Sequence, residues 1–180
     1  MEPEPLGVVL EQDRGHLPFA LIHGEALVAT AAWALGEAGV MLVDAGTTWA
    51  GLVDAGEPVV LHDPLCPMTP PDFIAACVQR AMDHDAVVVG VRPVTDTVKV
   101  VEDGVVGATI DRSTLVTVAS PVVLPPTVVA SLERLPATGF VELVTVLRAR
   151  FPVELAEAPP TARRVGSEED VRVLEALTRA

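Results

Sequence analysis

Short, nearly continuous runs of valine and leucine alternate with longer amphipathic stretches along the first half of the chain. The runs that read as strands are residues 7–10, 40–45, 58–63 and 86–94, and the intervening stretches that read as helices are residues 25–39, 47–56 and 69–85. Because these strands are apolar throughout instead of alternating, both faces of their sheet are expected to be covered. Strand–helix alternation of this kind predicts a parallel α/β sheet.

The rhythm changes at "VKVVEDGVVGATID", where two β-rich runs flank the turn dipeptide Asp103–Gly104. A long charged hairpin buries little of itself, so this arm, residues 95–114, is expected to pack elsewhere or on a second subunit. The rest of the chain reads as strands at 115–125 and 152–158, helices at 127–135 and 139–150, and a last helix. Ser167 is its expected N-cap, with Asp170 completing a capping box. Residues 1–180 are expected to form a single domain.

The charge balance narrows the possible partners. The chain has 180 residues, with 12 basic and 25 acidic side chains. This excess of negative charge argues against nucleic acid or an anionic membrane as a partner. The most apolar stretch, residues 26–35, is about half as long as a membrane span requires. The acidic start "MEPEPLGVVLEQD" lacks the basic region of a signal peptide, so a cytoplasmic protein is expected.

Ligands of such sheets bind at the carboxyl ends of the strands, which directs attention to the loops there. The first of these loops, "EQDRGHLPF", has only Gly15 to let a backbone approach phosphate, and Glu11 and Asp13 would repel it. An ordinary surface turn is therefore the favoured interpretation. Asp63 ends the third strand and can bind a ribose hydroxyl or a divalent metal. A turn-forming role before Pro64 explains Asp63 equally well.

A second group of candidates surrounds the arm. Thr97, Lys99 and Arg112 belong to it, and Arg163 and Arg164 precede the last helix. A hydroxyl combined with arginine or lysine from separate segments can cradle a phosphate monoester. Taken singly, each of these residues is better explained as part of a solvated surface. The two cysteines, Cys66 and Cys77, show no metal-binding spacing and read as reduced, structural thiols.

Three segments together resemble a known family. "VVLHDPLCPMTPPDFI", "PVTDTVKVVEDGVVGATIDRSTLVTVASPVVLP" and "ARRVGSEEDVRVLEAL" are similar, in order and spacing, to the methylerythritol-phosphate cytidylyltransferases of isoprenoid biosynthesis. The resemblance implies a nucleotide-diphospho-sugar-transferase-like (Rossmann-like) α/β fold, a three-layer sandwich with a protruding β-hairpin arm. It also implies a homodimer in which the arm reaches the partner's site. The family's reaction joins CTP to methylerythritol phosphate, releases pyrophosphate and requires Mg²⁺.

The resemblance also assigns roles to individual positions. Residues that match the sugar-phosphate side are Asp63, Thr97, Arg112 and Arg164, with Arg164 in place of a lysine. Residues that match the nucleotide side are Gly15, Thr47 and Ser120, and Asp63 is also the candidate metal ligand. Arg14 is the candidate for the catalytic arginine of the family's first loop.

The departures from the family pattern fall on the triphosphate side. The loop "LEQDRGHLPF" lacks the family's cradle glycines, and Phe19 stands at the position of the catalytic lysine. Cys66 replaces an arginine. Because nucleotidyl transfer depends on cations that neutralise developing negative charge, these losses predict a weakly active or non-catalytic homologue. The alternatives are an active CTP-dependent nucleotidyltransferase that makes a cytidine-diphosphate sugar alcohol, with Arg14 and carboxylate-held Mg²⁺, and a non-catalytic dimeric interaction module.

Overall fold

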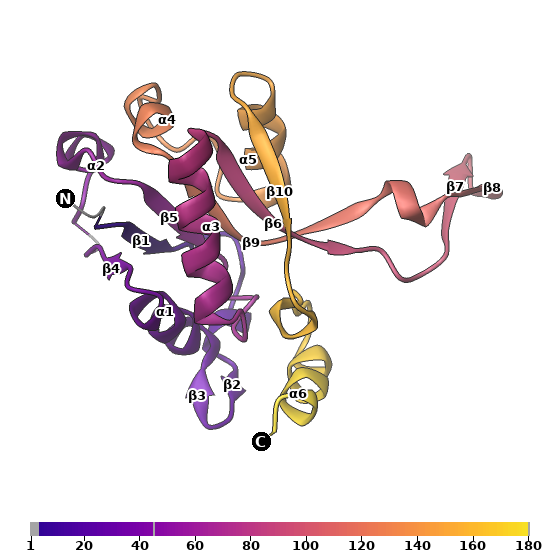
Figure 1. The fold of residues 1–180 in the computed structure, drawn as a ribbon. Helices are drawn as coiled ribbons and strands as arrows, with labels where there is room; N and C mark the ends of the chain where they lie inside the picture. The colour runs from indigo at the N-terminus through magenta and orange to yellow at the C-terminus, as the bar shows by residue number, and fades with distance from the viewer. Residues whose placement is uncertain (1–3, 45, 180) are drawn as a thin grey trace.

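A computed structural model describes residues 4–44 and 46–179, and its centre is a six-stranded sheet in the order β10-β6-β9-β5-β1-β4 (Figure 1). The sheet strands are β1 (Leu6–Val9), β4 (Met41–Leu42), β5 (Val59–His62), β6 (Val87–Pro93), β9 (Val116–Leu124) and β10 (Val153–Glu157). The central strands β5 and β6 are buried along almost their whole length. Their unbroken valine runs are thus explained by a sheet that is covered on both faces.

Helices cover the two faces of this sheet and complete a three-layer arrangement. The helices are α1 (Leu27–Glu37), α2 (Trp49–Ala55), α3 (Pro71–His84), α4 (Pro126–Ala130), α5 (Phe140–Arg148) and α6 (Glu168–Leu177). On one face α1 and α3 pack against alternate strand residues such as Val60 and Val88. On the other face α2, α4 and α5 pack against the remaining set, such as Leu61 and Val89. The expected α/β sandwich is confirmed.

The expectation of a parallel sheet is wrong at one strand. β9 runs antiparallel to both of its neighbours, β5 and β6, whereas β1 pairs in parallel with β4 and β5, and β10 with β6. The reason is the connection from β6 to β9, which contains the hairpin arm instead of a crossover helix. Without a helical crossover the chain returns alongside β6 in the opposite direction.

Several predicted elements are shorter in the structure than the sequence pattern implies. The run 40–45 forms only the two-residue β4, and Ala45 lies outside the described residues. The pattern 127–135 gives α4, which ends at Ala130. The predicted N-cap is confirmed, since the Ser167 hydroxyl accepts a hydrogen bond from Asp170 N–H. The Asp170 carboxylate, however, accepts from Gly166 N–H, one residue before the cap.

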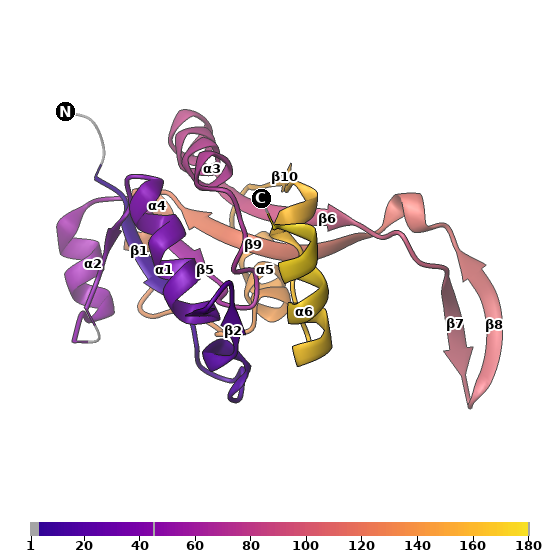
Figure 2. The same cartoon turned by 90° about the horizontal axis from the view of Figure 1, so that it is seen from below.

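The arm projects from the sheet as a separate ribbon (Figures 1 and 2). It consists of β7 (Val98–Glu102) and β8 (Val105–Ile110), followed by the short 3-10 helix η2 (Arg112–Thr114). Val101, Val105 and Val106 expose about two thirds of their surface there. An isolated two-stranded ribbon is only marginally stable in water, and the arm leaves these valines exposed to solvent.

The remaining elements pack around the first loop. They are the 3-10 helices η1 (Leu17–Phe19) and η3 (Pro160–Ala162) and the hairpin of β2 (Leu21–Ile22) and β3 (Glu25–Ala26). A third apolar cluster joins them to α6 through Ile22, Leu27, Leu65 and Leu174. The last helix is thereby held beside the first loop. No helix in the described part of the chain has the length and apolar character needed to cross a membrane.

Candidate functional site

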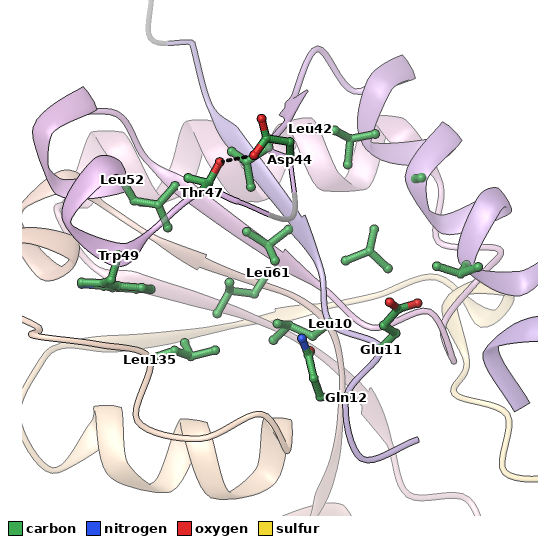
Figure 3. A pocket seen from close by; sticks show the side chains of 15 residues that line it. Leu10, Glu11, Gln12, Leu42, Asp44, Thr47, Trp49, Leu52, Leu61 and Leu135 are labelled. Atoms are coloured by element: carbon green, nitrogen blue, oxygen red, sulfur yellow. Dashed lines mark hydrogen bonds between the residues drawn. The ribbon is translucent and has the colours of Figure 1, made fainter. Parts of the chain in front are cut away.

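A cavity opens at the carboxyl ends of β1 and β4 (Figure 3). Its volume is about 480 Å³, within the range of ordinary ligand pockets. Trp49 and Leu135 lie on one side of it, and Glu11 and Gln12 on the other. The Trp49 indole is fixed because its Nε1–H donates to the Leu132 carbonyl at 2.8 Å. The cavity therefore has the position expected of a ligand site in this class of sheet.

The charge of this cavity is negative. Its described lining includes the carboxylates of Glu11 and Asp44 and no arginine, lysine or histidine. Thr47, which the family resemblance places on the nucleotide side, lines the cavity and donates to Asp44 Oδ1 at 3.2 Å. Most of the remaining lining is aliphatic. Such walls accept a planar or apolar group readily, but they offer no cation to a triphosphate.

The first loop carries Arg14 into the interior instead of toward this cavity. Its side chain is 3% exposed, and its Nε–H donates to Asp63 Oδ1 at 2.9 Å. Its other nitrogens donate to the carbonyls of Gln12 and Thr138, at 2.5 and 2.9 Å. The guanidinium also lies 5.6 Å from the centre of the Phe140 ring. Every part of the Arg14 head group is thus engaged within the protein.

Asp63 is the centre of this network. Its Oδ1 also accepts from Leu65 N–H, and its Oδ2 accepts from Arg164 Nε–H at 3.0 Å. Burial alone would raise the pKa of Asp63, but the hydrogen bonds from Arg14, Leu65 and Arg164 outweigh burial and hold the pKa below its usual value. A carboxylate neutralised by two guanidiniums is poorly suited to hold Mg²⁺, which prefers accessible carboxylate oxygens. Within residues 4–44 and 46–179, no other group of acidic, histidine or cysteine side chains gathers to hold a metal.

Ser120 contacts the backbone of Asp63 and the side chain of His62. Its side chain is fully buried, and its hydroxyl accepts from Asp63 N–H at 3.0 Å. It also lies 2.5 Å from His62 Nδ1. His62 Nε2 has no hydrogen-bond partner among the described residues. Burial lowers the pKa of His62 to about 4, against a smaller opposing effect of the Asp63 charge, so the imidazole is neutral at pH 7.

Two smaller cavities meet at Arg164. One, of about 370 Å³, lies between the first loop and the start of α6 and is lined by Arg14, Gly15 and His16. Gly15 has φ +60°, a backbone conformation that favours glycine. The other, of about 360 Å³, lies at the base of the arm and includes Arg92. Arg164 lines both cavities, and its side chain is 42% exposed.

The predicted arm residues lie apart from Asp63 within this chain. Thr97 and Arg112 are both exposed, and neither lines one of the cavities described above. Arg112 donates through Nη1 to the carbonyl of Thr95, which lines the cavity at the base of the arm. Arg112 is therefore tied to the rim of the cavity that contains Arg164. Lys99 lies in β7 and is exposed.

Two residues of this region were missed by sequence reasoning. Arg92 lies next to the last residue of the valine-rich strand β6, where it reads as the polar border of a strand. Thr138 lies in a loop, yet its carbonyl accepts from Arg14 and its hydroxyl donates to Asp13. No spacing signal links Thr138 to Arg14, because 124 residues separate them. The doubled arginine Arg163–Arg164 was the only sequence cue to this place.

Solved structures define the class to which this fold belongs. A 2-C-methyl-D-erythritol 4-phosphate cytidylyltransferase from Thermus thermophilus superposes with a TM-score of 0.69 at 23% identity, and both chains are covered completely. A 4-diphosphocytidyl-2C-methyl-D-erythritol synthase gives 0.73 at 17% identity, with 99% of this chain and 100% of the other covered. The protein therefore has the fold of the nucleotidyltransferases.

Sequence comparison narrows the class to a family. The sequence model of the 2-C-methyl-D-erythritol 4-phosphate cytidylyltransferases (IspD) matches residues 23–179, so the chain belongs to this family. The enzyme of that name from Symbiobacterium thermophilum is 36% identical over 124 residues, which are 66% of this chain and 52% of the relative. The one from Syntrophotalea carbinolica is 45% identical over 60 residues, 33% of this chain and 25% of the relative. The chain thus matches at most about half the length of these two relatives.

Proposed function

We propose that this chain is a cytidylyltransferase homologue that has lost efficient nucleotidyl transfer and keeps part of the sugar-phosphate side of the site. One observation carries the proposal: Arg14, the candidate loop arginine, is buried and bonded to Asp63. An arginine held in this way cannot move to a polyphosphate without breaking a buried ion pair. The same ion pair occupies the only carboxylate assigned to Mg²⁺.

Two further features support the proposal. The side chain of Phe19, which stands at the position of the family's catalytic lysine, is largely exposed and carries no charge. The cavity at the carboxyl ends of β1 and β4 has carboxylates in its described lining and no cation. Loss of a single charge-stabilising group typically slows such chemistry by a hundredfold or more. Losing a lysine and sequestering an arginine is expected to slow it further.

The test is a direct assay of transfer. The purified chain is incubated with CTP, 2-C-methyl-D-erythritol 4-phosphate and Mg²⁺, and pyrophosphate release is measured. We expect turnover at least about a hundredfold below ordinary enzyme rates of roughly 1–10³ s⁻¹. A matched reaction without the sugar phosphate gives the background. Turnover within the ordinary range would overturn the proposal and establish the alternative, an active CTP-dependent enzyme.

The exposed arm supports a second part of the proposal, a homodimer. Its valines lie on β7 and β8, which contact each other far more than they contact the body of the chain. A second copy of the chain is the partner that the family resemblance implies, and it would bring Thr97 and Arg112 to the neighbouring site. Exposed valines of this kind are the ordinary apolar centre of such an interface.

Changing the arm tests the dimer. The double substitution Val101→Lys and Val106→Lys places two charges in the proposed interface and is expected to shift the chain from dimer to monomer in sedimentation velocity. The body should keep its circular dichroism, since the arm contributes little to the core. Val141→Lys, at an exposed position of α5, is the matched control and should leave the dimer intact. A monomeric parent protein would contradict the dimer, and a double variant that stays dimeric would contradict the arm's role.

A further inference from the structure

The cavity at the base of the arm gathers positive charge to an unusual degree for this chain. Arg92, Arg163 and Arg164 line it, and its described lining contains no carboxylate. These are three of only 12 basic residues in a chain with 25 acidic ones. Two hydroxyl side chains, Thr95 and Thr117, lie in the same lining. Guanidinium and hydroxyl groups are the donors that phosphate oxygens accept from most readily.

The three arginines differ in how much of their charge is already used. Arg164 shares Asp63 with Arg14, so these three side chains together retain one positive charge. Within the described part of the chain, neither Arg92 nor Arg163 forms an ion pair. These two side chains therefore supply most of the uncompensated charge of the cavity.

A hydrogen bond to the backbone fixes the position of one of the cavity's arginines. Arg92 Nη1–H donates to the Ala158 carbonyl at 2.6 Å, which leaves its other nitrogens available. Arg163 and Arg164 follow directly after η3, at the entrance to α6. One opposing charge that the Arg163 guanidinium acts on is Asp170. Its lowered pKa comes first from the hydrogen bond of Gly166 N–H, and the Arg163 charge makes only a smaller contribution.

We infer that Arg92 and Arg163 form, with Arg164, a binding site for the phosphate of a phosphate monoester. The inference deepens the proposed function and rests on it for the retained phosphate side. The resemblance assigned only Arg164 of these three to that side. Arg92 and Arg163 supply the charge that Arg164 has lost to Asp63.

Titration calorimetry of the full chain at low salt, with glycerol 3-phosphate as the probe, tests the inference. Glycerol, which lacks the phosphate, and inorganic phosphate, which lacks the ester, are the ligand controls. We expect glycerol 3-phosphate to bind and glycerol not to bind. Arg163→Gln and Arg92→Gln should each weaken binding by about tenfold, the typical effect of losing one charge-assisted hydrogen bond. Arg134→Gln removes an exposed arginine elsewhere and should leave the affinity unchanged.

The outcomes are separable. Arg92 also donates a hydrogen bond to the backbone, so the Arg92→Gln variant is checked for folding by thermal denaturation. If that variant unfolds, the affinity of the variant at the exposed Arg163 tests the inference. Equal binding by the Arg163→Gln variant and the parent, or no binding of glycerol 3-phosphate by the parent, would overturn the inference. Equal affinity for inorganic phosphate would support the same three-arginine site and show that it reads the phosphate alone. Pyrophosphate release judges the proposed function separately, because a fully active chain would overturn that function and leave this site in place.

Discussion

Replacing Asp63 by asparagine is expected to lower the free energy of unfolding by about 3–5 kcal/mol, the usual cost of removing one partner from a buried ion pair. The substitution keeps the size of the side chain and removes its charge. Arg14, whose side chain is 3% exposed, would then remain buried with no anion to balance it. Arg164 would also lose its partner, at smaller cost because it is partly in solvent. Urea denaturation monitored by circular dichroism measures the change.

The control for this experiment is an ion pair of similar geometry in a more exposed place. Arg80 Nε lies 2.5 Å from Glu154 Oε2, with both side chains partly in water. Glu154→Gln should therefore cost far less stability than Asp63→Asn. A loss for Asp63→Asn as small as that for Glu154→Gln would show that Arg14 readily leaves its buried position. The proposed loss of nucleotidyl transfer depends on Arg14 being held in this position. Such a result would therefore count against that proposal as well as against the predicted cost of Asp63→Asn.

Acidification from pH 7 to pH 4 is expected to remove about 3 kcal/mol of stability through His62 alone. Its pKa is about 4 in the folded protein against 6.5 when exposed. Below pH 6.5 the unfolded chain therefore takes up a proton that the folded chain does not bind. Each pKa unit of difference is worth about 1.4 kcal/mol, so the stability present above pH 6.5 is lost progressively toward pH 4. The lowered pKa of Asp63 acts below this window, because its carboxylate is protonated in the unfolded chain only near pH 3.8.

Comparing variants isolates the histidine from the carboxylates that also titrate in acid. The difference in unfolding free energy between pH 7 and pH 4 should be about 3 kcal/mol smaller in His62→Asn than in the parent. His16→Asn, at an exposed position, is the matched control for replacing a histidine. An unchanged difference in the His62 variant would mean that the imidazole becomes protonated inside the folded protein. The Ser120 hydroxyl would then have to accept a hydrogen bond from Nδ1–H.

Much of the fold followed from the pattern of apolar residues. The valine runs predicted strands that are buried on both faces, and β5 and β6 have that environment. The Asp103–Gly104 dipeptide predicted the arm, and both residues have positive φ at its turn. The direction of β9 was missed because a strand's composition does not encode the orientation of its neighbours. That orientation was decided by the connection before it, in which a hairpin took the place of a helix.

The candidate site was less predictable. The sequence indicated Asp63 and Arg14 in loops at strand ends and Arg164 before the last helix, and the structure brings these three together. It gave no means to tell whether Arg14 faces a ligand or the interior. The sequence did not show whether the Ser120 hydroxyl contacts a ligand. In the structure Ser120 is fully buried and its hydroxyl contacts the His62 side chain. Arg92 looked like the ordinary polar end of a strand.

By itself, the sequence determined most of the strands and helices, the hairpin, the family and the absence of a lysine from the first loop. These properties depend on local periodicity, turn chemistry and matched motifs, all of which a linear chain displays. Only the tertiary structure decided which charges neutralise one another. Asp63 is 49 residues from Arg14 and 101 from Arg164, and an ion pair depends on distance and burial in space instead of separation along the chain. The same packing leaves Arg92 and Arg163 without such a partner among the described residues, at the base of the arm.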